Sequence, residues 1–329
     1  MAMTQEQVAH RARVSTATVS RVLNNKGAVG SARRVRVLKA VEELKYKPNL
    51  DARGLAAGSR SVGVIVSNFE NPFFLDIYKV VEAGAGIAGF EITMANTGYS
   101  PDRLTASVRL MIGRRVAGLA AIVPEMAPGL MEELNGYRIP MVFYGVGTPD
   151  GNIVHIRVNY RRGMEKLIAY LHSLGHRRVG FVGHRTTLGS IDERQTAVLD
   201  AVGRYSDLRV ETAAGEDTLE GGRRAAGMVL AANPAITAVI CANDLMALGT
   251  LRALRDRGLR VPQDISVTGF DNIKLAQFSD PPLTSVHISR ADIGGIICEC
   301  LFGPATLTGR EFVIDPELVL RDSTGPAAG

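Results

Sequence analysis

Residues 4–24 read TQEQVAHRARVSTATVSRVLN, and this stretch predicts two short helices separated by a tight turn. Thr4 and Gln7 have the spacing of a capping box, in which side chains satisfy free N–H groups at the start of a helix. Ser15 is a residue type that caps helices, and it stands where the second helix would begin. That helix has its apolar residues on one side: Val19, Val22 and Leu23. Two short amphipathic helices with a common buried side are therefore expected.

The outward side of the second helix carries small or short polar side chains and one arginine: Thr16, Ala17, Thr18, Ser20, Arg21 and Asn24. The major groove of DNA admits an α-helix and presents donors and acceptors that such side chains can reach. An ordinary amphipathic helix pair has the same pattern. This stretch alone leaves both interpretations open.

Positive charge is concentrated in the same part of the chain. The first sixty residues hold twelve lysines and arginines and four acidic residues, a net charge of +8, whereas the whole chain has a net charge of +5. The remaining residues therefore carry about −3. A solvated basic face is the simple explanation, but this asymmetry indicates a polyanion partner for the N-terminal segment only.

A third helix is expected over residues 31–45, with an apolar stripe at helical spacing: Val35, Leu38, Val41 and Leu44. Pro48 ends the helical pattern, and Asn49 can cap a further short helix. Gly54 weakens that short helix by about 1 kcal/mol relative to alanine. We expect it to fold only when DNA and a partner chain hold it.

Two motifs stand in this region: Val14-Ser15-x-x-Thr18-Val19-Ser20-Arg21-Val22-Leu23-Asn24 and Tyr46-x-Pro48-Asn49-x-x-Ala52-Arg53-x-Leu55. They closely resemble motifs of the LacI/GalR family of bacterial transcription regulators. The resemblance continues along the chain, with the motifs Asn71-Pro72-Phe73-Phe74, Leu174-Gly175-His176-Arg177-Arg178-Val179, Asn243-Asp244-x-Met246-Ala247-Leu248-Gly249 and Gly269-Phe270-Asp271.

The resemblance implies an all-α helix-turn-helix head, a hinge and a two-lobe body like that of periplasmic binding proteins, built on doubly wound parallel sheets. The head would span residues 1–48, the hinge helix and linker 49–60, and the body 61–329. Within the body, lobe 1 would comprise about 61–158 and 290–318, and lobe 2 about 159–289 and 319–329. The protein would be a homodimeric repressor that reads a pseudo-palindromic double-stranded operator. No leucine heptad follows Arg321, so a tetramer is not expected.

The same resemblance assigns roles to residues of the head. Arg21 would contact guanine or phosphate, and Thr16 and Ala17 would set sequence preference. Leu55 would enter the minor groove as a wedge, with Arg53 beside it. The remaining short polar side chains would hold phosphates: Thr18, Ser20 and Asn24.

In the body, apolar strand-like runs alternate with helical patterns, which favours parallel doubly wound sheets. Eight strands are expected, at 62–67, 91–95, 118–123, 140–144, 179–183, 208–212, 238–242 and 266–269. Ligands of open α/β sheets bind beyond the carboxyl ends of the strands. That rule selects six loops: 67–74, 96–99, 123–126, 183–194, 242–244 and 270–272.

These loops carry aromatic rings and planar polar groups, which suit a sugar-like ligand. By family resemblance the best ligand contacts are Arg194, Asn243 and Asp271, followed by Phe73 and Ser190. Arg194 can also bind a carboxylate, so a sugar acid remains open. Core packing is the alternative for Phe73, and a structural ion pair is the alternative for Arg194 with Asp271. Asp244 is expected to order the loop or cap the helix that it begins.

Other functional classes lack support in the sequence. No phosphate-binding Gly-rich motif, zinc pattern or nucleophile elbow occurs, so we expect neither an enzyme nor a cofactor nor a metal. A periplasmic-type sugar-binding protein is the rival, but it predicts a signal peptide and no basic head. The cysteines are expected in the core of a cytoplasmic, nucleoid-associated protein without a membrane span: Cys241, Cys298 and Cys300.

Arg13 departs from the family pattern, which has glycine in the turn between the first two helices. If the turn requires a positive φ, arginine costs about 1 kcal/mol there.

Overall fold

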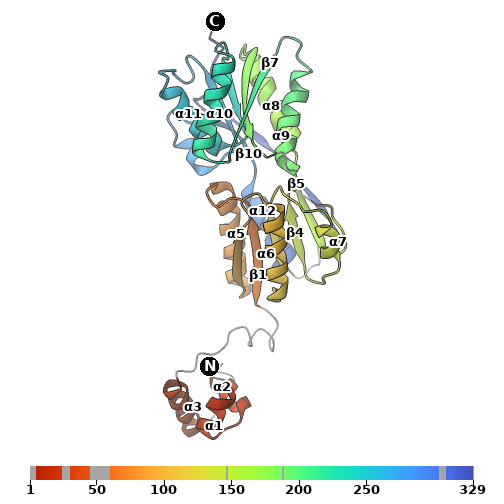
Figure 1. The fold of residues 1–329 in the computed structure, drawn as a ribbon, viewed down its shortest axis with the longest axis vertical. Coiled ribbons are helices and arrows are strands. Elements are labelled where there is room, and N and C mark those ends of the chain that lie inside the picture. The colour runs from red at the N-terminus through yellow and green to blue at the C-terminus, as the bar shows by residue number, and fades with distance from the viewer. Residues whose placement is uncertain are drawn as a thin grey trace. The chain divides into compact units, whose positions relative to one another are not determined.

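The computed structural model describes residues 5–23, 30–44, 60–145, 147–186, 189–303 and 309–328. The chain divides into two units, residues 1–59 and 60–329. Figure 1 shows the helical head, in red, and the larger α/β body. The two units are taken separately below.

Three helices form the head: α1 (Gln5–Ala12), α2 (Thr16–Leu23) and α3 (Ser31–Glu43). Their shared core consists of Val8, Ala9, Ala12, Val19, Val22, Val37 and Ala40. The predicted cap of the second helix is confirmed, because Thr18 N donates to Ser15 Oγ at 3.2 Å. An ion pair of 2.6 Å between Arg11 and Glu43 also joins α1 to α3.

The predicted apolar stripe of the third helix is wrong in its first half. Val35 is 64% exposed and Leu38 is 48% exposed, whereas Val37 and Ala40 are buried. At about 100° per residue, positions three apart rotate steadily around the helix, so four such residues do not share one face. The head core instead contacts positions 37, 40, 41 and 44, which follow the i, i+3, i+4, i+7 spacing of a helix face.

The turn between α1 and α2 requires the backbone conformation anticipated for Arg13. Its φ is +51°, in the left-handed region, and Val14 N donates back to Ala9 O at 3.1 Å. This arrangement closes the C-terminus of α1, where glycine is the usual residue.

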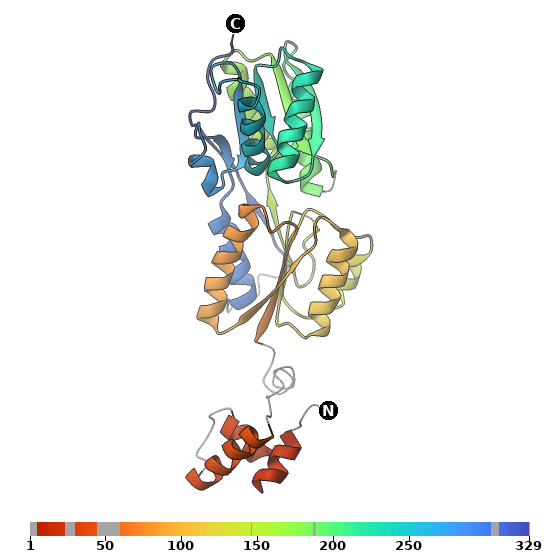
Figure 2. The same cartoon turned by 60° about the vertical axis from the view of Figure 1, so that its left-hand side comes forward.

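Lobe 1 of the body is built on a six-stranded sheet of order β11-β5-β4-β3-β1-β2. All its strand pairs are parallel. The strands are β1 (Ser61–Val66), β2 (Glu91–Asn96), β3 (Leu119–Ile122), β4 (Met141–Tyr144), β5 (Ile153–Val158) and β11 (Glu311–Ile314). In Figure 2, α5 (Pro72–Ala88) and α12 (Arg290–Phe302) cover one face, and α6 (Pro101–Gly113) and α7 (Leu130–Asn135) cover the other.

Lobe 2 is built on a second six-stranded sheet, of order β12-β10-β9-β8-β6-β7. Its strands are β6 (Arg178–His184), β7 (Arg209–Gly215), β8 (Ala238–Cys241), β9 (Ser266–Asp271), β10 (Thr284–His287) and β12 (Glu317–Val319). Only β12, of these, runs antiparallel to its neighbour, β10. The helices are α8 (Tyr160–Ser173), α9 (Gly189–Val202), α10 (Leu219–Ala232), α11 (Asp244–Arg255) and the 3-10 helix η1 (Lys274–Gln277). Figure 1 shows α10 and α11 on one face and α8 and α9 on the other.

The predicted fold class is confirmed, and each of the eight expected strands overlaps a strand of the structure. Four further strands, β5, β10, β11 and β12, were not expected. The sequence of β5 contains His155 and Arg157, and β11 and β12 are only four and three residues long. Short strands with charged residues lack the apolar run by which the other strands were recognised.

The chain crosses between the lobes after β5, after β10 and after β11. The third crossing corrects the expected boundary, because Glu317 and Leu318 pair with β10 of lobe 2 rather than belonging to lobe 1. Arg290 at the start of α12 donates to the carbonyl oxygens of Asp271 and Asn272, so it joins lobe 1 to lobe 2 beside the second crossing. Within the described residues, no helix has the length and apolar character needed to cross a membrane.

Replacing Arg13 with glycine should stabilise the head, because glycine adopts a positive φ without steric cost. The matched control is Arg13→Ala, which removes the same charge but keeps the Cβ atom. We expect the glycine variant to exceed the alanine variant by about 1 kcal/mol in local stability. Hydrogen exchange of the α1 and α2 amides in the full chain measures this difference. Equal protection in the two variants would contradict backbone strain at this turn.

Candidate functional site

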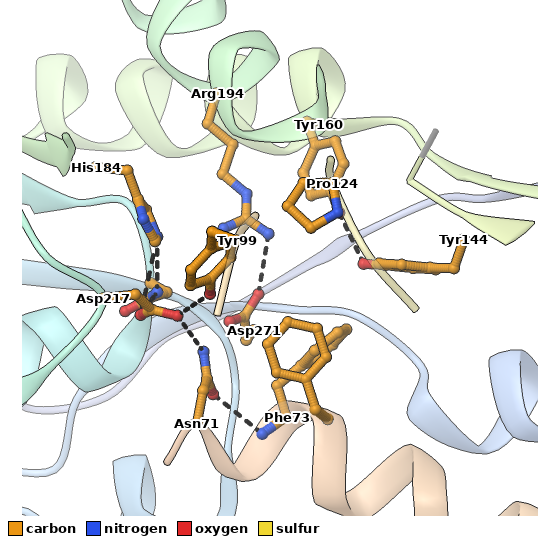
Figure 3. Close-up of a pocket in the computed structure, with 12 residues that line it drawn as sticks. Asn71, Phe73, Tyr99, Pro124, Tyr144, Tyr160, His184, Arg194, Asp217 and Asp271 are labelled. Carbon is orange, nitrogen blue, oxygen red and sulfur yellow. Dashed lines mark hydrogen bonds and ion pairs between the residues drawn. The ribbon is translucent and has the colours of Figure 1, made fainter. Parts of the chain in front are cut away.

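A small cavity, with about 30 Å³ of space for the centres of water-sized molecules, lies between the two lobes. Its lining side chains come from both lobes: Asn71, Phe73, Phe74, Tyr99, Pro124, Tyr144, Tyr160, His184, Arg194, Asp217, Asn243 and Asp271. Most of them stand at the carboxyl end of a strand or directly after it, which is where open α/β sheets bind ligands. Figure 3 shows these side chains converging from several elements.

Arg194 and Asp271 form a buried ion pair within lobe 2. Arg194 projects from α9, and its Nη2 lies 3.4 Å from Asp271 Oδ1, while Nη1 donates to Ala242 O at 3.0 Å. The guanidinium carbon lies 4.5 Å from the ring centre of Tyr160 and 5.0 Å from that of Phe270. Arg194 Nε is buried without a hydrogen-bond partner within the described part of the chain. Such an unpaired buried donor can bind a ligand acceptor.

The pKa values of both members of this pair are raised, for different reasons. Burial raises the pKa of the Asp271 carboxyl to about 7, although the Arg194 charge acts to lower it. Burial lowers the pKa of Arg194, but the Asp271 carboxylate outweighs burial and the net shift is upward. Arg194 therefore stays charged at every pH of interest, whereas Asp271 titrates near neutrality. Asp271 also adopts a φ of +98°, a conformation rare for a residue with a Cβ atom.

Asp217 is a second buried carboxylate in the cavity, and sequence reasoning missed it. Its Oδ1 accepts a hydrogen bond from Asn243 Nδ2 at 2.5 Å, and its Oδ2 accepts one from the Tyr99 hydroxyl. Burial raises the pKa of Asp217, but nearby His184 and these hydrogen bonds outweigh burial, and the net shift is downward. The expected strand 208–212 ended too early. In the structure β7 continues to Gly215, so the loop at Asp217 was not among the predicted ligand loops.

Aromatic rings form another wall of the cavity. The Phe73 ring lies 5.9 Å from the Tyr144 ring, and the Tyr144 hydroxyl lies 2.7 Å from the Tyr160 hydroxyl. Sequence reasoning named Phe73 but neither tyrosine. Tyr144 ends a strand and Tyr160 begins a helix, and the apolar patterns there gave no sign that either faced a cavity. Phe69 belongs to the loop 67–74, which was expected to contribute rings to the cleft, but it is 39% exposed and is not among the lining residues.

The structure brings four of the five predicted ligand residues to one cavity: Phe73, Arg194, Asn243 and Asp271. The side chain of Ser190 lies outside the described part of the chain. Asn243 also caps α11, because its Oδ1 accepts from Met246 N at 2.9 Å. The expected role of Asp244 is confirmed, since it accepts hydrogen bonds from Ile273 N and Ser285 Oγ and orders the loop after β9.

On the head, α2 presents the predicted reading side. Thr16, Ala17 and Arg21 are exposed, and the Thr18 hydroxyl lies 3.0 Å from that of Ser15. The Ser20 side chain and the residues Asn24, Arg53 and Leu55 lie outside the described part of the chain. No group of three or more potential metal ligands occurs among the residues that the structure describes.

Comparison with known families matches both parts of the chain. Residues 4–49 match the family described as bacterial regulatory proteins of the lacI family, and residues 168–324 match a periplasmic binding protein-like domain. The HTH-type transcriptional repressor PurR of Pasteurella multocida is 31% identical over 328 residues, covering 97% of this chain and 98% of the relative. The HTH-type transcriptional repressor CytR of Escherichia coli K12 is 31% identical over 331 residues, covering 98% and 96%.

Solved structures agree with these relatives. A LacI family transcriptional regulator from Silicibacter pomeroyi has a TM-score of 0.82 and 26% identity, and the match covers 98% of this chain and 99% of that one. The lac repressor dimer bound to operator and the anti-inducer ONPF has a TM-score of 0.77 and 27% identity, with coverage of 99% and 100%. The relatives are repressors rather than enzymes. With its helix-turn-helix head and two-lobe α/β body, this chain belongs to the LacI family of bacterial regulatory proteins and is a DNA-binding transcriptional repressor under the control of a small-molecule effector.

Proposed function

We propose that the protein is a homodimeric repressor of the bacterial cytoplasm whose operator affinity is controlled by a small, uncharged sugar bound in the interlobe cavity. The observation that carries this proposal is the combination of aromatic rings, amides, carboxylates and one guanidinium around a single cavity. Aromatic rings stack on the faces of sugars, and the planar polar groups bind pairs of hydroxyls.

The charge of the cavity favours a neutral sugar over a sugar acid. Two buried carboxyl groups, Asp217 and Asp271, face a single guanidinium, that of Arg194. Asp271 is the ion-pair partner of Arg194, with Oδ1 at 3.4 Å from Nη2. Burial lowers the pKa of His184, which reduces the positive charge beside Asp217. An acidic ligand would be repelled by the negative charge of Asp217. A related solved structure, the regulator CelR in complex with cellobiose, has 27% identity and a TM-score of 0.68, and it supports a sugar ligand.

The head supports the proposed contacts with a pseudo-palindromic operator. The exposed side of α2 carries Thr16, Ala17 and Arg21, and the head region has the excess of positive charge that DNA phosphates attract. Each subunit of a dimer would read one half-site, as expected for a two-fold operator. Thr18, Ser20, Asn24, Arg53 and Leu55 retain the roles that family resemblance assigns to them. The lac repressor, whose structure is that of a dimer on its operator, supports this arrangement.

The two-lobe body indicates how the effector would control operator affinity. The lobes are joined by three chain crossings, and the effector cavity lies between them. An effector that contacts both lobes changes their relative arrangement, and any change transmitted to the heads couples the two sites reciprocally. Such couplings are typically about 1–3 kcal/mol.

The proposal is tested with the full-length protein. A bound duplex is first selected from a random pool. The effect of neutral sugars, amino sugars and sugar acids on its binding is then measured by fluorescence anisotropy. We expect at least one neutral sugar to change the operator dissociation constant and to raise the melting temperature of the protein. Selection of no duplex would contradict the proposed operator binding, and a response to sugar acids alone would contradict the neutral-sugar assignment.

Replacing Arg194 with lysine should weaken effector binding at least tenfold, about 1.4 kcal/mol. Lysine keeps the charge but loses the planar fork and its stacking on Tyr160 and Phe270. Calorimetric titration with the sugar identified above measures the loss. The matched control is Arg204→Lys, an exposed arginine paired with Glu165, which should bind the sugar as the wild type does. Equal loss in both variants would show that the effect is not specific to the cavity.

Replacing Asp271 with asparagine should change how stability depends on pH. The pKa of Asp271 in the folded state is raised to about 7, above its unfolded value, so ionisation favours unfolding between these two pKa values. The wild type should lose stability relative to Asp271→Asn as pH rises from 5 to 7, and the difference should level off above pH 8. Urea unfolding of both proteins across this range measures the difference. A constant difference would mean that Arg194 outweighs burial at this carboxyl.

A further inference from the structure

We propose that Asp217 is a positioning residue that holds the two lobes closed before the effector binds. Its carboxylate, on lobe 2, is bound by Asn68 and Tyr99 of lobe 1, and these three residues are called here the Asp217 bridge. The proposal rests on the proposed function only in taking the cavity as the effector site.

The bridge joins segments that are far apart in sequence and belong to different lobes. Asn68 Nδ2 donates to Asp217 Oδ2 at 3.1 Å and to the Asp217 backbone oxygen at 2.8 Å. The Tyr99 hydroxyl donates to the same Oδ2, and Asn71 Nδ2 approaches it at 3.5 Å. Asn68 and Tyr99 follow β1 and β2, whereas Asp217 follows β7. None of the three lies in a segment where the chain crosses between the lobes.

The charge of Asp217 makes these contacts stronger than ordinary polar contacts. The Asp217 side chain is 1% exposed; within the described residues no lysine or arginine forms an ion pair with it, and His184 Nε2 of the same lobe lies 3.8 Å from its Oδ1. Hydrogen bonds to an ionised acceptor are stronger than those between neutral groups, and a buried carboxylate without partners is costly. Opening the lobes removes the donors of lobe 1 from Asp217, which leaves it with Asn243 and His184 of lobe 2.

The backbone conformation of Tyr99 is a second observation that supports the contact between Tyr99 and Asp217 across the lobes. Tyr99 has a φ of +62°, in the left-handed region that tyrosine rarely adopts. Its ring packs edge-on against His184 of lobe 2, with ring centres 5.7 Å apart. Non-glycine residues persist in this conformation where surrounding contacts determine it, and two of the contacts of Tyr99 come from the opposite lobe.

Asn68 makes the inference testable without altering the cavity. It binds Asp217 but is not among the cavity-lining residues, unlike Tyr99 and Asn71. Its Oδ1 also accepts from Glu70 N at 2.8 Å, within its own loop. Asn68→Asp keeps an acceptor for that local bond, loses the donor to Asp217 and adds a like charge opposite it. Asn68→Ala removes both hydrogen bonds to Asp217 and the local bond from Glu70 N. The matched control is Glu70→Ala, an exposed neighbour without a bond to Asp217 through its side chain.

The experiment measures lobe separation by single-molecule energy transfer in the full-length protein without effector or DNA. Dyes are attached at Glu132→Cys in lobe 1 and Glu220→Cys in lobe 2, both exposed positions, with Cys298 replaced by serine. Labelled subunits are diluted with unlabelled ones, so that each dimer carries one dye pair. Circular dichroism establishes that every variant is folded.

We expect a closed population in the wild type and in Glu70→Ala. Asn68→Ala should raise the ratio of open to closed molecules about tenfold, and Asn68→Asp should raise it further. Asp217→Asn should open the lobes as well, and adding Asn68→Ala to it should open them by a smaller factor than in the wild type, because only the bond to the Asp217 backbone oxygen is still to be lost. Identical distributions in the wild type, both Asn68 variants and Asp217→Asn would overturn the proposal. Since no effector is added, this result does not depend on whether the effector is a neutral sugar.

Discussion

The burial of one guanidinium and two carboxyl groups between two lobes is the constraint on which the rest of the body depends. Arg194, Asp217 and Asp271 are all at least nine-tenths buried, and each needs compensation for its lost hydration. Arg194 and Asp271 compensate each other within lobe 2, and two aromatic rings cover the guanidinium. Asp217 is compensated by His184 of its own lobe and by neutral donors, several of which belong to the other lobe. The buried charge of Asp217 in lobe 2 is therefore stabilised in part by hydrogen bonds from lobe 1.

Parallel sheet topology explains why these groups meet. The carboxyl ends of β1, β2, β3 and β4 carry lining residues of lobe 1, and those of β6, β7, β8 and β9 carry lining residues of lobe 2. Helices cover both faces of each sheet, so the strand ends are where polar side chains can gather in a cavity. Arg290 then ties α12 to the loop after β9, which places a cross-lobe contact beside a chain crossing as well as in the cavity.

The head is held together by a much smaller core. Its buried residues are mostly alanines and valines, and the turn that sets α1 against α2 places an arginine in a left-handed conformation. A small core contributes little to the free energy of folding, because hydrophobic stabilisation scales with the apolar area buried. The exposed Val35 and Leu38 of α3 add nothing to this core.

The sequence by itself determined the periodic elements and the order in which they occur. Alternating strands and helices predicted parallel sheets, and the strand-end rule placed Phe73, Arg194, Asn243 and Asp271 in loops or helix starts that meet at the cavity. The serine cap of α2 also followed from local pattern, because a cap depends on a few neighbouring residues. The possibility of a positive φ at Arg13 came from the family resemblance, which has glycine at that position. Only the tertiary structure decided that Asp217, Tyr144 and Tyr160 face the cavity and that Val35 and Leu38 face solvent. The physical reason is that local pattern reports which side of an element is apolar, whereas the partner of a charge or ring depends on which distant segment packs against it.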